Sequence, residues 1–285
     1  MAVSSSYSYL KIPVNDRPGA LSDSRIMQSS IRNRLLAAMS PKDFGRLERK
    51  LELIELDVRT VLVRPNQSIE YVYFMESGLA SEIAVNPDRQ RIEVAHVGRE
   101  GLVGKPVLLG LDRTPNEVFM QVQGSAFRMP AGDLTEVMDK APSVRALLLR
   151  YVHTCLINFG HAALANGRYN IKERLARWLL TCHDRVGRDE LPLTHEFLSL
   201  MLGVRRSGVT QALHLLEVEK AIGVRRGLIV VSDRDKLERI AGGSYGVPEA
   251  EYERVIARPE PQDIRPPELA LSPKRRPLQF DDLEA

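Results

Sequence analysis

The sequence predicts an α+β fold, in which a jelly-roll β-barrel is followed by a long helix and a second, mainly helical domain. Two observations support this order. Short runs rich in β-branched and aromatic residues fill the chain from Leu53 to about Met129, and helical spacing of apolar residues replaces them from Asp133 onward. With 285 residues, the chain is long enough for two modest domains and their tails.

The composition is that of an ordinary water-soluble protein, with 44% hydrophobic and 27% charged residues. No apolar run approaches the roughly 18 residues of a membrane span, and the N-terminus "MAVSSSYSYLKIP" lacks the apolar core of a signal peptide. We therefore expect a cytoplasmic protein with no membrane partner. The two cysteines, Cys155 and Cys182, have no metal-site spacing, so we expect no zinc finger, no iron–sulfur cluster and no other metal or cofactor.

The N-terminal part divides into an arm and a barrel domain. Residues 1–28 are rich in Ser and without periodicity, which predicts a flexible arm. Residues 29–132 are expected to form the barrel domain, beginning with short helices; Ser40 is placed as the N-cap of the second and Pro41 as its first residue. The strands are predicted in "LIELDVRTVLV", "YVYFM", "LASEIAV", "RIEVAHV" and "VFMQVQGSAFRM", with turn signals such as "NPDRQ" between them.

Residues 133–167 are predicted to form one long helix. Apolar side chains recur along it at spacings of three and four, at Val144, Leu148, Tyr151, Cys155 and Phe159. Such a seam is typical of a coiled-coil-like dimer interface, although packing against the chain's own barrel would produce the same stripe. We predict that this seam joins two copies of the chain.

The last predicted domain, residues 168–241, holds the basic surplus of the chain. From Leu164 to Ala241 there are 14 Lys/Arg against 10 Asp/Glu, whereas from Gly242 to Ala285 there are 6 against 9. A surplus of four is weak support for a nucleic-acid partner when taken alone. Residues 242–285 are Pro-rich and charged, as in "RPEPQDIRPPELALSPKRRPLQFDDLEA", and are expected to be disordered.

The stretch "MLGVRRSGVTQAL" predicts a helix-turn-helix. Thr194 can cap a first helix, and Gly203 supplies the backbone conformation that ends it. A second helix follows, with Val209, Leu213 and Leu216 facing inward. Its opposite face then carries a set of polar side chains: Arg206, Ser207, Thr210, Gln211 and His214. In a helix-turn-helix the second helix enters the DNA major groove.

A basic hairpin follows directly in "GVRRGLIVV", with Arg225 and Arg226 near the bend. Such a wing would reach the phosphates that flank the groove. The alternative is a plain helical hairpin whose arginines are merely solvated. The succession of turn, polar helix face and basic wing favours the DNA-binding interpretation.

This arrangement resembles the Crp/Fnr family of bacterial transcription regulators over roughly Leu35 to Ala241. The most specific match is "LTHEFLSLMLGVRRSGVTQALHLLE", with weaker support from "YVYFMESGL" and "VGREGLVGKPVLLGLDRT". The resemblance implies a winged helix-turn-helix, a homodimer on a two-fold-symmetric site in double-stranded DNA, and RNA polymerase as a candidate partner. It places base reading at Arg206, Ser207 and Gln211. The full expected DNA-binding set is Thr194, Arg205, Arg206, Ser207, Thr210, Gln211, Arg225 and Arg226.

The resemblance also marks an effector pocket in the barrel, which this chain keeps only in part. Family members that bind cyclic nucleotides use a Gly-Glu pair for the ribose and an Arg-Ser or Arg-Thr pair for the phosphate. Here the corresponding residues are Gly104 with Lys105, and Arg113 with Thr114. Because a lysine cannot accept a hydrogen bond from a ribose hydroxyl, we expect an effector other than cyclic AMP, or none.

Two other classes of protein remain to be compared with a DNA-binding regulator. A metalloenzyme built on a jelly roll needs several His and carboxylate ligands, and His96 is the sole histidine between Leu53 and Met129, so we expect no enzyme. A ligand-binding or scaffold protein that works through protein partners is the open alternative. The arginines at 205, 206, 225 and 226 argue against it.

Overall fold

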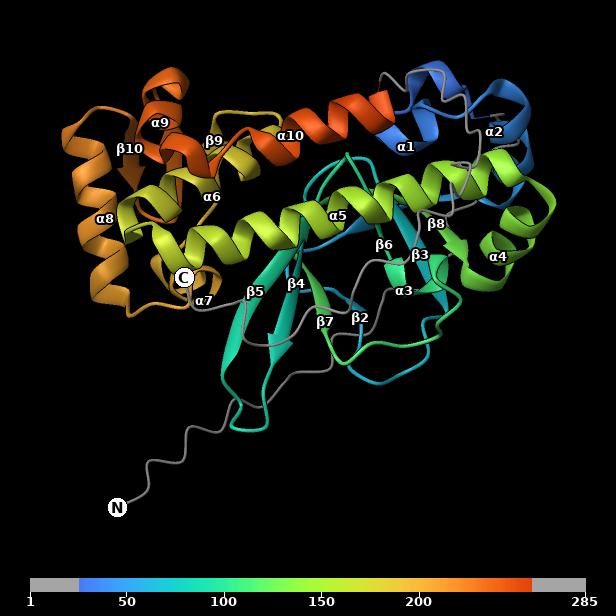
Figure 1. The fold of residues 1–285 in the computed structure, drawn as a ribbon, viewed down its shortest axis with the longest axis horizontal. Coiled ribbons are helices and arrows are strands. Elements are labelled where there is room, and N and C mark those ends of the chain that lie inside the picture. Colours follow the sequence, from blue (N-terminus) through green and yellow to red (C-terminus); the bar gives the residue numbers. More distant parts are fainter. Residues whose placement is uncertain (1–25, 258–285) are drawn as a thin grey trace, which may run out of the picture.

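A computed structural model describes residues 26–257 of the chain (Figure 1). It shows a β-sheet domain, a long helix that runs along it, and a helical domain at the far end of that helix. The mixed α+β fold predicted from the sequence is confirmed. Most of the predicted N-terminal arm and the last part of the predicted tail lie outside the described residues.

Short helices precede the barrel: η1 (Gln28–Ser30), α1 (Arg34–Ala37), α2 (Pro41–Leu47) and η2 (Glu48–Lys50). The predicted cap of α2 is confirmed, because the Ser40 hydroxyl accepts a hydrogen bond from the Asp43 amide at 3.1 Å. Pro41 follows at the first helical position, where a missing N–H costs nothing.

The barrel consists of two antiparallel four-stranded sheets. In the first, the spatial order is β1 (Glu52–Leu56), β8 (Gly124–Pro130), β3 (Tyr71–Met75) and β6 (Leu102–Val103). In the second, it is β2 (Val61–Val63), β7 (Glu117–Val122), β4 (Leu79–Val85) and β5 (Arg91–Val97). The short helix α3 (Lys105–Leu108) follows β6. Sequence neighbours are split between the sheets, as expected for a jelly roll.

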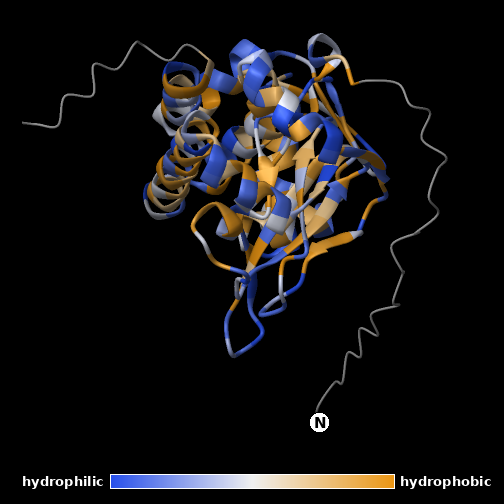
Figure 2. Cartoon of the chain, turned by 90° about the vertical axis from the view of Figure 1, so that its right-hand side faces the viewer, coloured by the Kyte–Doolittle hydropathy of each residue, from blue (hydrophilic) through white to orange (hydrophobic). Residues whose placement is uncertain are grey.

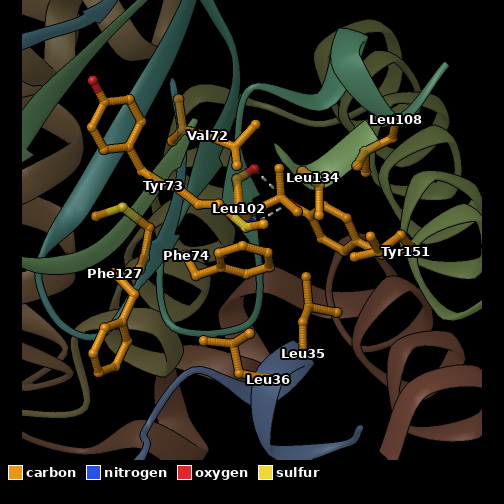
Figure 3. Close-up of a cluster of buried hydrophobic side chains, with 14 of the residues drawn as sticks. Leu35, Leu36, Val72, Tyr73, Phe74, Leu102, Leu108, Phe127, Leu134 and Tyr151 are labelled. Atoms are coloured by element: carbon orange, nitrogen blue, oxygen red, sulfur yellow. Dashed lines mark hydrogen bonds between the residues drawn. The ribbon is translucent and has the colours of Figure 1, made fainter. Parts of the chain in front are cut away.

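The barrel core contains buried side chains of both sheets and of the helices that cover the first sheet, and Figure 3 shows part of it. Phe74 and Leu102 from the sheet meet Leu35 of α1 and Leu134 of the helix that follows the barrel, all with fully buried side chains. The hydropathy view shows the same arrangement, with apolar segments gathered inside and hydrophilic residues on the outer helix faces and loops (Figure 2). The N-terminal helices therefore belong to the barrel domain.

The single helix predicted from Asp133 is two helices, α4 (Ala131–Lys140) and α5 (Pro142–Arg168). The break falls at Ala141, which has φ −132° and ψ 89°. Its cause is Pro142, because a proline ring excludes the helical conformation from the residue before it. The 27 residues of α5 extend for about 40 Å at 1.5 Å per residue.

The predicted dimer seam on α5 is wrong for its first three residues. Val144, Leu148 and Tyr151 are 1%, 0% and 3% exposed and belong to the barrel core of the same chain. The Tyr151 hydroxyl also donates to the Leu102 carbonyl oxygen at 3.3 Å (Figure 3). Cys155 and Phe159 are half-buried on the same side. The stripe therefore arises from packing on the barrel, which the spacing alone could not distinguish from a dimer seam.

The C-terminal domain begins with α6 (Ile171–Val186), which has a capping box between Asn170 and Glu173. There follow β9 (Glu190–Leu191), α7 (His195–Leu202), α8 (Arg206–Val218), β10 (Ile222–Arg225), β11 (Leu228–Val231) and α9 (Arg234–Ala241). Barrel residues enter the core of this domain: Leu79, Ile83, Phe119 and Val122 pack with its buried side chains. The barrel and the C-terminal domain thus share one hydrophobic cluster.

The disorder predicted from Gly242 is wrong for residues 242–257. These residues form η3 (Gly242–Ser244), α10 (Val247–Tyr252) and η4 (Glu253–Ala257). They run back beside α5 toward α1 (Figure 1), and Tyr252, Val255 and Ile256 are buried in the barrel core. We call residues 242–257 the C-terminal extension. Its apolar side chains outweigh the charged composition that predicted disorder.

Candidate nucleic-acid interface

The turn between α7 and α8 is formed as the sequence predicts. The Thr194 hydroxyl accepts from the Phe197 amide at 3.2 Å and caps α7. Gly203 ends the helix with φ +63°, and the Val204 amide donates to the Ser199 carbonyl oxygen at 3.1 Å. The turn is therefore fixed by a cap at one end of α7 and a left-handed glycine at the other.

Gly203 also lies against the barrel. A Cβ at this position would lie 2.9 Å from Cδ1 of Ile92 on β5, so the end of the Ile92 side chain would have to shift. Met201, two residues earlier, lies with its sulfur 3.9 Å from the Ser81 hydroxyl on β4. The helix-turn-helix is thus seated on the β4–β5 side of the barrel.

The two faces of α8 differ as predicted. Val209, Leu213 and Leu216 are at most 2% exposed and form its inner face. The outer face presents only exposed polar side chains: Arg206, Ser207, Thr210, Gln211 and His214. No acidic residue lies in the first turn of the helix. This face can therefore donate hydrogen bonds to an anionic partner without competition from its own carboxylates.

The first turn of α8 has no side-chain cap, because Arg205 occupies the N-cap position. An arginine offers no acceptor for the free amides there. The positive end of the helix dipole and the Arg205 and Arg206 side chains therefore lie together at the exposed start of α8. Such a site favours a phosphate group.

One contact between the two helices was not predicted. The Thr210 hydroxyl donates to the Arg206 carbonyl oxygen at 3.1 Å and lies 3.1 Å from Nδ1 of His195 at the start of α7. The hydroxyl is thus engaged within the protein, and its role is to hold the outer face of α8 against α7. Nothing in the local sequence pattern signals a contact between residues 15 positions apart.

The wing is a tight hairpin, as predicted. Arg225 pairs with Leu228 across β10 and β11, so that Arg226 and Gly227 form the turn, with Gly227 at φ +71°. Both arginines are exposed. Within residues 26–257, no carboxylate lies within 4 Å of the guanidinium groups at 205, 206, 225 and 226. These four residues and the outer face of α8 form one basic surface.

The two cations of the predicted effector site, Lys105 and Arg113, have different carboxylate partners. Lys105 forms an ion pair with Glu82 of β4, with 2.6 Å between Nζ and Oε2, and the two side chains are only 14% and 11% exposed. The second oxygen of Glu82 accepts a hydrogen bond from the side-chain amide (Nδ2) of Asn116 at 2.8 Å. Burial opposes ionisation of both groups, yet their mutual attraction prevails, so that the pKa of Glu82 is lowered and that of Lys105 is raised. The lysine at the position expected for a ribose contact is thus already paired with a carboxylate of the chain.

Arg113 lies apart, in solvent. It pairs with its neighbour Asp112 at 2.8 Å, and both side chains are 60% exposed. The Thr114 hydroxyl accepts a hydrogen bond from the backbone amide of Asn116 at 3.3 Å. Gly104 has φ +103°, and a Cβ there would meet Val72 at 2.9 Å, so its glycine serves the local turn. The two cations therefore bind different carboxylates of the chain.

Two family models match the chain. The Crp-like helix-turn-helix domain matches residues 173–240, and the cyclic nucleotide-binding domain matches residues 53–141. No curated protein matches it. Between residues 26 and 257, no helix is long and apolar enough to cross a membrane, and no three His, Cys, Asp or Glu side chains are grouped as a metal site.

Solved structures share the fold at low sequence identity. A putative Crp/Fnr regulator from Eubacterium rectale is 17% identical with a TM-score of 0.58, covering 73% of this chain and 97% of its own. FixK2 from Bradyrhizobium japonicum is 18% identical with a TM-score of 0.60, covering 68% and 98%. The regulator CLP from Xanthomonas campestris, described as responsive to c-di-GMP, is 17% identical with a TM-score of 0.56, covering 67% and 99%.

The two matched domains occur in the same order as in these structures, joined by the same kind of long helix. The barrel, α5 and the helix-turn-helix with its wing are thereby all accounted for. The chain belongs to the Crp/Fnr family of transcription regulators.

Proposed function

We propose that the protein is a sequence-specific, DNA-binding transcription regulator that acts in the cytoplasm as a homodimer on a two-fold-symmetric operator. One observation carries the proposal: the outer face of α8 and the wing form a basic surface whose four arginines have no carboxylate partner in the described part of the chain. Unpaired, exposed guanidinium groups beside a helix N-terminus are suited to a phosphate backbone.

The side chains of this surface divide into base-reading and backbone-binding groups. Arg206, Ser207 and Gln211 are exposed on α8 and would face the base edges, with Arg206 able to form a bidentate pair with a guanine. Arg225 and Arg226 on the wing would bind flanking phosphates. Arg205 and Thr194, exposed at the starts of α8 and α7, would add backbone contacts.

The proposed dimer uses the face of α5 that points away from the barrel. Leu149, Leu156 and Leu164 are 42%, 61% and 47% exposed there, and their spacings of seven and eight put them on one side of the helix. A second copy of the chain would cover them and replace the seam first predicted. The two recognition helices of the dimer, one α8 from each copy, would then lie about 34 to 36 Å apart. This is the spacing of two half-sites that are one helical turn of DNA apart.

We propose that the barrel does not use cyclic AMP as its effector. The buried Lys105–Glu82 pair occupies the position where a ribose contact is expected, and Arg113 is paired outside it. DNA binding should therefore not depend on a cyclic nucleotide. A regulator of this kind acts at promoters, where RNA polymerase is its candidate partner.

The test is selection of the purified full-length chain on random duplex DNA at fixed salt, with and without cyclic AMP or cyclic GMP. Enrichment of a palindrome under all conditions supports the proposal. Enrichment only with a nucleotide overturns the account of the barrel and keeps the regulator. Absence of enrichment under every condition overturns the proposal in favour of a scaffold that works through protein partners.

The dimer interface has its own test. Leu156→Glu places a charge in the centre of the exposed face of α5 and should convert the dimer to a monomer, as measured by analytical ultracentrifugation. Leu111→Glu is the matched control, because Leu111 is similarly exposed, at 57%, but lies on the barrel. Equal masses for wild type and Leu156→Glu would contradict the proposed interface.

A further inference from the structure

A cavity of about 350 Å³ lies where the barrel, α5, α6 and the C-terminal extension meet. Its walls include His96 of β5, Phe159 of α5, Trp178 of α6 and Tyr252 of α10. This volume falls within the roughly 300 to 1,000 Å³ typical of small-molecule sites. The cavity is distinct from the basic surface, because none of the residues proposed to contact DNA lines it.

Two arginines one turn apart on α6 line this cavity and have only neutral partners. Arg177 is 9% exposed; its Nε donates to the Ser244 carbonyl oxygen at 2.9 Å, and its Nη2 donates to Oδ1 of Asn158 at 3.3 Å. Arg174 donates from Nη2 to the Leu202 carbonyl oxygen, while its Nε is buried without a partner. Burial lowers the pKa of both guanidinium groups.

Three other cations in the same wall are neutralised by carboxylates. Arg34 pairs with Glu253 at 2.5 Å, Lys105 with Glu82 at 2.6 Å, and Arg185 with Glu100 at 2.8 Å. In the described structure, no carboxylate lies within 4 Å of the guanidinium nitrogens of Arg174 or Arg177. A buried cation without a counter-charge is costly, so this pair is suited to an anion supplied from outside.

The three acidic side chains that remain in the wall have other partners, and the first of them, Asp184, pairs with Arg234 at 2.8 Å. Glu93 accepts from Nε1 of Trp178 at 2.6 Å and lies 3.1 Å from Nδ1 of His96. Glu249 accepts from the Gly246 amide at 3.0 Å. Glu93 and Glu249 attract Arg177 from a distance, but neither lies within 4 Å of its guanidinium nitrogens, so both arginines can still contact a ligand.

The rest of the wall is suited to an organic molecule. Phe159, Trp178 and Tyr252 supply aromatic surface, and Nε2 of His96 is a buried polar atom with no partner in the protein. Pockets of this kind combine apolar walls with a few polar groups that orient the ligand. An inorganic ion alone would leave the aromatic surface uncovered.

We propose that this cavity binds a small organic anion, whose carboxylate or phosphate group is held by Arg174 and Arg177 and whose body packs against Trp178 and Phe159. The bidentate geometry of a guanidinium group matches both kinds of anion. Lys105 also lines this cavity, with its Nζ 5.5 Å from the centre of the Phe159 ring, but its charge is already balanced by Glu82.

The same arginines connect the cavity to the DNA-binding elements. The carbonyl oxygen that accepts from Arg174 belongs to Leu202, the last residue of α7 before the turn at Gly203. The carbonyl oxygen that accepts from Arg177 belongs to Ser244 in the C-terminal extension. An anion that draws these guanidinium groups toward itself would change how α7 is held, and this coupling step rests on the proposed DNA-binding function.

Trp178 is the only tryptophan of the chain and lines the cavity, so its fluorescence reports on binding there. The full-length protein is titrated with citrate and, separately, with inorganic phosphate, with sodium chloride at matched ionic strength as the reference. A saturable change in Trp178 emission with either anion is expected. Saturation by citrate alone indicates a carboxylate ligand, and saturation by phosphate alone indicates a phosphate ligand.

Arg174→Gln and Arg177→Gln should each weaken this binding at least tenfold, whereas Arg168→Gln, an exposed arginine at the end of α5, should leave it unchanged. If Arg177→Gln fails to fold, Arg174→Gln carries the test, because Arg174 is only half-buried. Absence of saturation with both anions, or equal affinity in Arg174→Gln and wild type, overturns the proposal. These measurements use the free protein, so a failure of DNA binding would not affect their outcome.

Discussion

The cations of the barrel and those of the basic surface differ in whether the chain supplies a carboxylate partner. In the barrel, Lys105 and Arg128 each have a carboxylate partner, Glu82 and Glu52, at 2.6 and 2.7 Å. On α8 and the wing, no arginine has one among the residues that the structure describes. A cation whose charge is balanced within the chain serves stability, and one left unbalanced at an exposed surface is available to an external anion.

Arg174 and Arg177 are a third case, because neither has a carboxylate within 4 Å in the described structure, although Arg177 is buried and Arg174 half-buried. Burial excludes long polymers and admits only what fits the cavity. Under the two proposals, the same chemical group would serve internal pairing, DNA binding and small-anion binding in one chain, according to its exposure and its neighbours.

The largest expected effect is on the buried barrel pair. Glu82→Gln removes the counter-charge of Lys105 and should reduce the free energy of unfolding by about 3 to 5 kcal/mol, as measured by urea denaturation. Arg206→Gln, on the DNA-facing surface, should change it by less than about 0.5 kcal/mol. Similar losses for both substitutions would remove the distinction between balanced and unbalanced cations.

The next effect concerns DNA recognition. Arg206→Ala should cost about 1 to 3 kcal/mol of binding free energy at one base position, because it removes a bidentate base contact. Arg225→Ala should weaken binding to all sequences and lower the salt dependence by about one phosphate contact. Competition binding with operator variants at several salt concentrations measures both. Equal, sequence-independent losses would show that Arg206 is not a base reader.

A smaller effect is expected from His96 as the pH falls. Burial and the nearby Arg185 lower its pKa, against the attraction of Glu93, so that below about pH 6.5 the unfolded chain binds more protons than the folded one. Stability should therefore decrease with acidification below pH 6.5, by up to roughly 1.4 kcal/mol per pH unit. His96→Gln should remove this part of the slope in urea titrations, whereas His214→Gln, on the exposed face of α8, should keep it.

The smallest effect is expected from Arg113→Ala. Its ion pair with Asp112 is exposed on both sides, and such pairs contribute little to stability. The urea midpoint and the DNA affinity, with or without cyclic AMP, should both match wild type. A loss of DNA binding that appears only with cyclic AMP present would show that Arg113 holds a cyclic phosphate after all.

The helix-turn-helix could be predicted from the sequence because its determinants are local. Thr194, Gly203 and the spacing of Val209, Leu213 and Leu216 fix the cap, the turn and the inner face within about twenty residues. The wing was predictable for the same reason, since its turn depends on a single glycine between two short strands.

Contacts between distant parts of the chain could not be predicted in this way. Helical spacing on α5 identified which side chains are buried, but not that Val144 and Leu148 pack against their own barrel. The pairing of Lys105 with Glu82 joins residues 23 positions apart across the barrel. In residues 242–257, the few apolar side chains are dispersed among charged residues, so their packing in the barrel core could not be predicted from the local composition.

The C-terminal extension brings the last described residues into contact with the barrel and with α1. Its Tyr252 hydroxyl donates to the Glu100 carbonyl oxygen at 2.6 Å, and the Arg34 guanidinium group near the start of the chain lies 4.8 Å from the centre of the Tyr252 ring. The DNA-binding domain is thus tethered to the barrel on two sides, by α5 and by the extension. Any rotation of that domain relative to the barrel must strain or break the contacts of the extension. The free energy of these contacts therefore limits how far the domain can rotate and adds to the free energy that an effector must supply to move it.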